Sequence, residues 1–183
     1  METKKWIQEL DSVTLSIKNE FGVLSEEQLN WKPDASTWSV GQIIDHLIVI
    51  NKTYFPIFSQ LKNNEYQLIW LGKINFMVRF FGNLILKSVN PDRRKKMKTL
   101  SIWEPTKSQI GTDVIQKFSE QQQTLKDWIS NCSSLLDAGT IISSPANRVI
   151  VYELETAFDI IVSHEKRHLE QARELIWLYD KVA

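Results

Sequence analysis

Residues 163–171 read Ser-His-Glu-Lys-Arg-His-Leu-Glu-Gln and hold two of the three histidines in the chain. His164 and His168 lie inside a long helical pattern with an i, i+4 spacing. Their side chains therefore lie one above the other on one helix face, about 40° apart. Two imidazoles in this arrangement can bind the same metal ion. The stretch predicts a helix that brings a pair of metal ligands to one face.

Apolar residues on both sides of the histidine pair continue the same helical face. Steps of three and four connect the members of this stripe, which are Leu154, Ala157, Ile161, His164, His168, Gln171 (or Ala172), Leu175 and Leu178. The two histidines thus stand where the pattern requires core residues. A buried polar group without a partner costs about 1–3 kcal/mol. We therefore expect both histidines to have hydrogen-bond partners or to bind a metal.

The third histidine, His46, lies in the second turn of another expected helix. Ser39 and Gln42 have the spacing of a capping box and mark the start of that helix. Three neutral imidazoles are the minimal ligand set for a metal site that keeps an open position. Zinc, nickel, iron and copper all accept imidazole ligands. We predict that His46, His164 and His168 bind one divalent ion.

Helical spacing and the scarcity of Gly and Pro predict an all-α fold. Pro56 should kink the second of the four main helices. The long connection at residues 63–110 would let the second and third helices run parallel. We expect one domain, residues 1–183, built as a four-helix bundle with a long crossover between helices two and three. The main helices are expected at about 4–21, 39–62, 112–131 and 152–179, with a polar loop before the last.

Two segments of the 63–110 connection have alternative interpretations. Residues 68–90 have about the length of a membrane-spanning helix. Lys73, Arg79 and Lys87 interrupt it, however, and each charge at the bilayer centre costs about 2.5–3.5 kcal/mol. We expect a buried or partly buried helical excursion. The basic run Arg93–Lys96 is expected to be solvated, because no nucleic-acid-binding fold accompanies it.

The overall composition gives no charge for an anionic partner. Lys plus Arg equals Asp plus Glu at 22 each, so neither nucleic acid nor a membrane is an expected partner. The single cysteine, Cys132, excludes an internal disulfide and is expected to be a buried, inert thiol. The N-terminal residues METKKWIQELDS are charged and amphipathic, unlike a signal peptide. We expect a cytoplasmic protein.

The histidine pair also satisfies H-E-x-x-H, the zinc-protease pattern in which the glutamate is the general base. Only 15 residues follow His168, and they contain neither a Gly nor a further His to supply a third ligand. No strand upstream could hold an extended peptide substrate. We therefore expect Glu165 to be an exterior residue or to support a ligand from behind.

Three further residues lie near His46 in the sequence. Asp45 points about 100° away from His46 and is expected at the surface or behind the ligands. Trp31 and Trp38 flank the helix start and could line a pocket over His46. A hydrophobic staple at the helix start is the simpler expectation for them.

Two blocks of this sequence resemble the DinB-like (YfiT-like) superfamily of metal-dependent proteins. LSEEQLNWKPDASTWSVGQIIDHL, residues 24–47, contains W-S-x-G-x-x-x-x-H-L, and HEKRHLEQ, residues 164–171, contains H-x-x-x-H-x-x-Q. The resemblance covers essentially the whole chain and is weakest over residues 68–104. It implies an up-down-down-up four-helix bundle. It also implies that one histidine of helix two (His46) and two of helix four (His164 and His168) hold the metal.

The resemblance implies zinc or nickel as the metal and a low-molecular-weight thiol, such as bacillithiol, mycothiol or glutathione, as cosubstrate. We expect a metal-dependent S-transferase that acts on a small molecule in detoxification or stress response. Gln171, one turn beyond His168, is a candidate for orienting the ligand. A metal-dependent hydrolase is one alternative. A non-catalytic metal-binding bundle that dimerises is another, since homodimers are common in the family.

Overall fold

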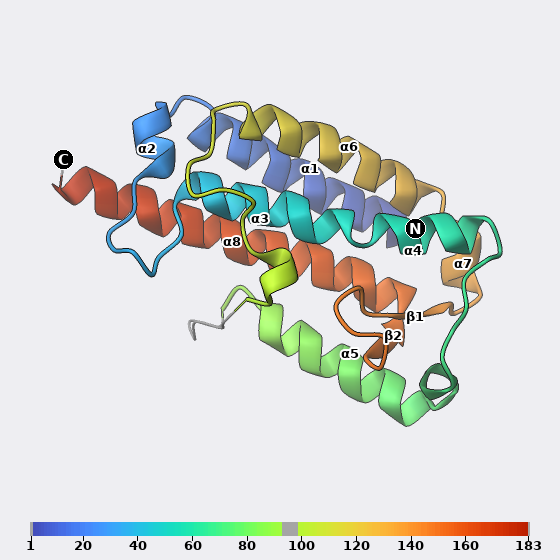
Figure 1. The fold of residues 1–183 in the computed structure, drawn as a ribbon. Helices are drawn as coiled ribbons and strands as arrows, with labels where there is room; N and C mark the ends of the chain where they lie inside the picture. The colour runs from blue at the N-terminus through green and yellow to red at the C-terminus, as the bar shows by residue number, and fades with distance from the viewer. Residues whose placement is uncertain (1, 93–98, 183) are drawn as a thin grey trace.

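The computed structural model describes residues 2–92 and 99–182, which are mostly helical (Figure 1). Helices contain most of these residues, and turns and a small sheet connect them. The elements in chain order are α1 (Glu2–Phe21), α2 (Glu26–Asn30), α3 (Val40–Lys52), α4 (Phe55–Lys62), the 3₁₀ helix η1 (Trp70–Lys73), α5 (Asn75–Val89), the 3₁₀ helix η2 (Ser101–Trp103), α6 (Val114–Ser130), α7 (Ser133–Asp137), β1 (Ile141–Ser143), β2 (Val151–Glu153) and α8 (Leu154–Val182).

The long helices α1, α3, α6 and α8 lie side by side. Both α1 and α3 pack against α6 and α8. In Figure 1, α1 and α8 run in one direction, whereas α3 and α6 run in the other. The long connection between α3 and α6 makes the parallel arrangement of these two helices possible.

Two apolar clusters form the core, and polar residues separate them along the helices. One cluster contains Leu10, Phe58, Leu125, Phe158 and Val162 among others, and the second contains Ile17, Leu47, Phe118 and Leu169 among others. The buried polar residues Asn51, Gln121, Gln122, Glu165 and His168 lie between these stretches of their helices. These polar residues of α3, α6 and α8 therefore form a layer between the two apolar clusters.

Capping boxes mark the starts of α2 and, as predicted, of α3. Ser25 and Gln28 form a capping box at α2, and Ser39 and Gln42 form another at α3. In each box the serine hydroxyl accepts a hydrogen bond from the backbone N–H of the glutamine. The α3 box fixes the helix start, and hence the turn on which His46 lies.

The expected kink at Pro56 is instead a break between two helices. Helix α3 ends at Lys52 and α4 begins at Phe55, so Pro56 lies in the first turn of α4. The missing N–H of a proline needs no partner in a first turn. The prediction of a single kinked helix over residues 39–62 is therefore wrong.

The 63–110 connection contains α5, which packs on α8 and β2. Val78 and Gly82 are its buried residues, so α5 is the partly buried helical excursion that we expected. Among the described residues, no helix is both long enough and apolar enough to pass through a membrane. The predicted solvated basic run, Arg93–Lys96, lies outside the described residues.

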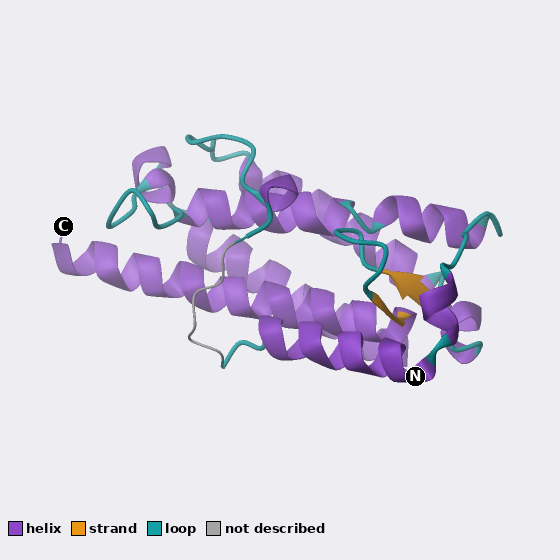
Figure 2. Cartoon of the chain, turned by 60° about the horizontal axis from the view of Figure 1, so that its bottom comes forward, coloured by secondary structure: helices purple, strands orange, loops and turns teal. Residues whose placement is uncertain are grey.

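A two-stranded antiparallel sheet, β1 with β2, flanks the expected polar loop before α8, which connects the strands at residues 144–150, and the fold is thus mostly helical rather than purely all-α. Ile142 faces Tyr152 in the register, and both side chains are buried. Three-residue strands are too short to produce a recognisable alternating pattern. Figure 2 shows the sheet at the end of the helices near the N-terminus and far from the C-terminus.

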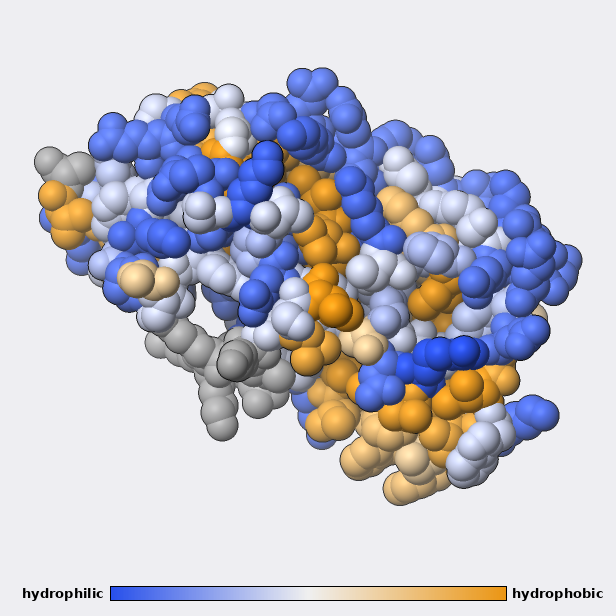
Figure 3. Space-filling view, in the orientation of Figure 1, coloured by the Kyte–Doolittle hydropathy of each residue, from blue (hydrophilic) through white to orange (hydrophobic). Residues whose placement is uncertain are grey.

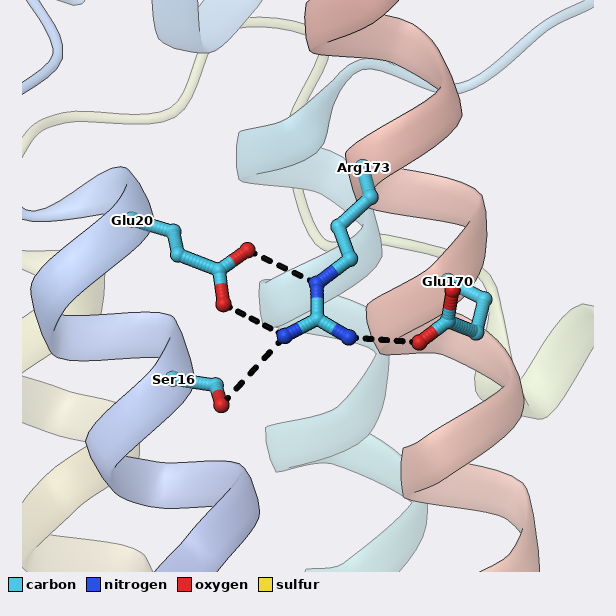
Figure 4. A network of polar contacts seen from close by, with 4 residues as sticks. All are labelled: Ser16, Glu20, Glu170 and Arg173. Carbon is cyan, nitrogen blue, oxygen red and sulfur yellow. Dashed lines mark hydrogen bonds and ion pairs between the residues drawn. The ribbon is translucent and has the colours of Figure 1, made fainter.

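An arginine fork fastens α1 to α8 on the outside (Figure 4). Arg173 donates to Glu20 through Nε at 2.7 Å and Nη2 at 2.5 Å, and to Glu170 through Nη1 at 2.6 Å. Nη2 also lies 3.4 Å from the Ser16 hydroxyl oxygen. The hydrogen bonds from Arg173 hold the pKa of Glu20 below its usual value.

Candidate metal site

The three histidines converge on one point between α3 and α8. Nε2 of His168 lies 3.0 Å from Nε2 of His164, and Nε2 of His46 lies 3.5 Å from that of His164. One ring nitrogen from each histidine lies within 4.8 Å of the others. The structure thus brings together the three residues that the sequence singled out as ligands.

Burial keeps these imidazoles neutral. It is the largest effect on each ring, lowering the pKa of His46 and taking the pKa values of His164 and His168 well below the usual range. Neighbouring imidazoles and Arg167 lower the values of His164 and His168 further. Neutral imidazole is the form that binds metals. The donor set therefore fits a divalent cation, to which each ring can present the lone pair of the nitrogen that carries no proton.

A backbone carbonyl fixes the orientation of His46. Nδ1 of His46 lies 2.5 Å from the carbonyl oxygen of Trp103 in η2. A carbonyl can only accept, so Nδ1 carries the proton and Nε2 presents its lone pair to the cluster. Residue 103 belongs to the 63–110 connection, and no local pattern in the sequence indicated this role.

Asp45 anchors the same loop from the other side. Its Oδ2 accepts hydrogen bonds from the backbone N–H of Thr106 at 2.6 Å and from the Thr106 hydroxyl at 2.8 Å. Asp45 was expected either at the surface or behind the ligands, and in the structure it is half-buried. Because it precedes His46 directly, the loop that orients His46 is tied to the helix turn that bears it.

Trp38 lies against the cluster, and Trp31 does not. The Trp38 ring centroid is 4.9 Å from that of His46 and 6.4 Å from that of His168. The Trp38 and His168 rings are stacked. Trp31 instead contacts Tyr179 edge to face at 5.5 Å. Trp38 therefore contacts His46, as the less favoured of the two interpretations required, and a pocket over His46 stays a prediction.

His164 is the least buried of the three histidines. His46 and His168 are only 2% and 8% exposed, whereas His164 is partly exposed. Within residues 2–92 and 99–182, no cysteine, carboxylate or further histidine joins the three. Three protein ligands and a solvent-facing side are typical of metal sites that bind a substrate or water in the remaining position.

Gln171 is half-buried, one turn beyond His168. It raises the pKa of His168 slightly, against the stronger effect of burial. The contact does not satisfy Nδ1 of His168, which has no hydrogen-bond partner among the described residues. A role for Gln171 in orienting a ligand stays a prediction.

Glu165 lies in the core, so the exterior position suggested for it is wrong. It is fully buried, and its Oε1 accepts hydrogen bonds from Asn51 at 2.7 Å and Gln122 at 2.6 Å. Burial raises the pKa of this carboxyl to about 7, and the two hydrogen bonds act in the opposite direction. Glu165 therefore connects α8 to α3 and α6 and is not part of the histidine cluster, which argues against the role of a protease base.

Asn51 and Gln122 are polar residues that the sequence analysis missed. Both lie on helix faces that are otherwise apolar, where a buried amide needs a partner. That position was the available signal, but the shared partner, Glu165, is distant in sequence. Cys132, by contrast, behaves as predicted: it is buried, and burial raises the pKa of its thiol to about 11.

A mostly helical chain with three converging buried histidines defines a candidate metalloprotein. The chain matches the DinB superfamily over residues 17–172 and belongs to that family, as its sequence blocks indicated. It is 27% identical over 159 residues to the uncharacterized protein YuaE of Bacillus subtilis (strain 168). The aligned region covers 86% of this chain and 88% of YuaE. No solved structure matches the chain.

Proposed function

We propose that this chain is a metal-dependent enzyme that acts on a small molecule, with His46, His164 and His168 as ligands of one zinc or nickel ion. The supporting observation is the convergence of three neutral imidazoles, without a fourth protein ligand among the described residues and with His164 partly exposed. A purely structural site usually has four protein ligands and is closed. Membership of a metal-dependent family supports the same proposal.

The residues around the cluster would each have a defined task. The Trp103 carbonyl holds the proton of His46 on Nδ1, so that Nε2 faces the ion. Trp38 covers His46 and His168 with an aromatic surface and keeps water from that side. The substrate would approach past His164, the most exposed ligand.

Thiol-dependent S-transfer is the reaction that we propose. An ion held by three neutral imidazoles lowers the pKa of a thiol or water that reaches it and so supplies a nucleophile near neutral pH. The sulfur forms a bond to an electrophilic carbon, and that carbon loses its leaving group with the bonding electron pair. The histidine cluster contains no carboxylate among the described residues, so the thiol proton passes to solvent beside His164.

We further infer that α1, α3, α6 and α8 form an up-down-down-up four-helix bundle of one domain that works in the cytoplasm. The helix packing and the length of the 63–110 connection support this arrangement. A homodimer is the assembly to test first, because homodimers are common among proteins that the sequence resembles.

The test is a thiol-consumption assay on the zinc- or nickel-loaded protein. Bacillithiol, mycothiol and glutathione are each supplied with an alkyl or aryl halide, and loss of thiol and release of halide are followed together. With one of the thiols, we expect the amount of thiol lost to equal the amount of halide released. We expect no turnover by a His168→Ala variant. Activity without thiol would identify a hydrolase. A fully metal-loaded protein that is inactive in both assays would identify a binding protein.

A further inference from the structure

Helix α5 has an exposed apolar stripe. Phe76, Phe80 and Leu84 follow one another at i, i+4 and i+8 and are 72%, 50% and 51% exposed. Such spacing places all three on one face of the helix. The Phe76 and Phe80 rings stack with their centroids 6.1 Å apart. In Figure 3, apolar side chains gather at the lower right, in the region where Figure 1 shows α5.

The stripe does not result from loose packing of α5. The opposite face of the helix is fixed, because Val78 and Gly82 are buried and α5 packs on α8 and β2. A Cβ at Gly82 would lie 3.2 Å from the Thr156 side chain, so the two helices are in close contact there. Because α5 packs on α8 and β2 through its opposite face, the stripe faces the solvent.

Exposed apolar residues continue just before α5. Trp70 in η1 is 68% exposed and Ile74 is 38% exposed. Elsewhere, apart from the neighbours Leu100 and Ile102, exposed large apolar residues such as Leu15 and Val149 occur singly, which is normal for a protein surface. A concentration of this kind marks an interaction surface.

The charged residues of the segment that bears the stripe are all positive. Lys73, Arg79 and Lys87 are exposed, and the sequence has no Asp or Glu between residues 66 and 91. Arg79 and Lys87 border the same surface hollow as Phe76, Phe80 and Leu84. Two copies of this face would bring like charges together, which disfavours a symmetric dimer through it. An anionic surface fits both the charge and the apolar stripe.

We propose that α5 docks this protein onto anionic lipid bilayers. Phe76, Phe80 and Leu84 enter the boundary between headgroups and acyl chains, while Lys73, Arg79 and Lys87 contact the lipid phosphates. The 15-residue helix lies along the surface, consistent with the absence of a spanning helix from the described residues. This role differs from our sequence-based expectation of no membrane partner, because the neutral net charge of the chain concealed a local basic segment.

Vesicle sedimentation of the full chain tests this proposal. The probes are vesicles of phosphatidylcholine alone and of phosphatidylcholine with about a quarter phosphatidylglycerol. We expect binding to the anionic vesicles only, with loss of binding in high salt. The double variant Phe76→Ser, Phe80→Ser should lower the partition coefficient by about tenfold or more. Leu15→Ser, at an exposed site on α1, is the matched apolar control and should bind like wild type.

A charge series separates electrostatic attraction from apolar insertion. Lys73→Gln, Arg79→Gln and Lys87→Gln combined should abolish the preference for anionic vesicles. The triple variant Lys4→Gln, Lys5→Gln, Lys18→Gln on α1 removes the same charge and should retain that preference. Wild-type protein that fails to bind either vesicle would overturn the proposal. So would a dimer in analytical ultracentrifugation that dissociates on substitution of Phe76 and Phe80, since the face would then belong to a second copy.

Discussion

Nδ1 of His46 donates to the carbonyl oxygen of Trp103 across a distance of 2.5 Å. The contact joins a candidate metal ligand on α3 to a residue 57 positions later in the chain. The same loop returns to Asp45, the residue before His46, through both hydrogen bonds from Thr106. The 63–110 connection therefore helps to shape the histidine cluster as well as linking two helices.

Loosening the loop should weaken metal binding without unfolding the protein. Asp45→Ala removes the acceptor for both hydrogen bonds from Thr106. Loss of a residue that supports a ligand typically lowers metal affinity by about 10–100-fold. Competition with a chromophoric zinc chelator measures the change. Asp137→Ala, at an exposed site in α7, is the control, and equal affinities for the two variants would contradict the role of Asp45.

The Glu165 network should contribute to stability and leave metal binding intact. Glu165→Leu removes the acceptor of two buried amide donors, on Asn51 and Gln122. Each donor left unpaired costs about 1–3 kcal/mol, so the free energy of unfolding should fall by roughly 2–6 kcal/mol. Urea denaturation measures this fall.

Apolar replacement of the whole Glu165 network provides the control. The triple variant Asn51→Leu, Gln122→Leu, Glu165→Leu removes both amide donors together with their acceptor and should recover much of the lost stability, reduced by the hydrogen bond that buried Gln121 accepts from Gln122. A triple variant that is even less stable than Glu165→Leu would show that packing, rather than hydrogen bonding, explains the loss. Loss of metal from Glu165→Leu would contradict its exclusion from the ligand set.

The Glu20–Arg173 pair should stabilise the fold only above acidic pH. Its hydrogen bonds lower the pKa of Glu20 in the folded state, so the unfolded chain binds the proton more readily as the pH falls. The contribution is thus present above about pH 4.5 and lost as the pH falls through the lowered pKa. Both side chains are more than a third exposed, which limits the contribution to about 0.2–1 kcal/mol.

The variant Arg173→Gln tests this pH dependence by chemical denaturation at two pH values. We expect a loss of stability at neutral pH and a smaller loss at the acidic pH, because the contribution of the pair falls as the pH falls through the lowered pKa of Glu20. Lys117→Gln breaks a more exposed pair with Asp113 and should have a smaller effect at both values. An equal loss at the two pH values for Arg173→Gln would assign its contribution to packing.

Cys132 should resist alkylation in the native protein. Its thiol is 3% exposed and burial raises its pKa to about 11, so little thiolate forms near neutral pH. Iodoacetamide should react at least about 100-fold more slowly with the folded chain than with the chain in urea. Mass spectrometry of timed samples gives both rates. Comparable rates would show that the thiol is accessible.

Local signals explain what the sequence predicted well. The capping box at Ser39 and Gln42 and the spacing of His164 and His168 depend on residues a few positions apart. Helical periodicity also placed the inward faces of α3 and α8 toward a shared core. These features follow from short-range geometry, and together they predicted the convergence of the three histidines.

Long-range contacts explain what the sequence could not predict. Trp103 meets His46, and Asn51 meets Glu165, only after the helices pack, so neither pair leaves a local pattern. The strands β1 and β2 are too short to alternate visibly. Pro56 indicated a disruption, but whether it kinks or ends a helix depends on the neighbouring turn at residues 53–54.

Metal analysis of the purified protein tests the central claim most directly. Wild-type protein and a Cys132→Ala control, dialysed against buffered zinc or nickel, should each contain about one divalent ion per chain. The variant His46→Ala, His168→Ala should contain almost none while keeping its helical circular dichroism. An unchanged metal content in that variant would contradict the assignment of His46, His164 and His168 as the ligands.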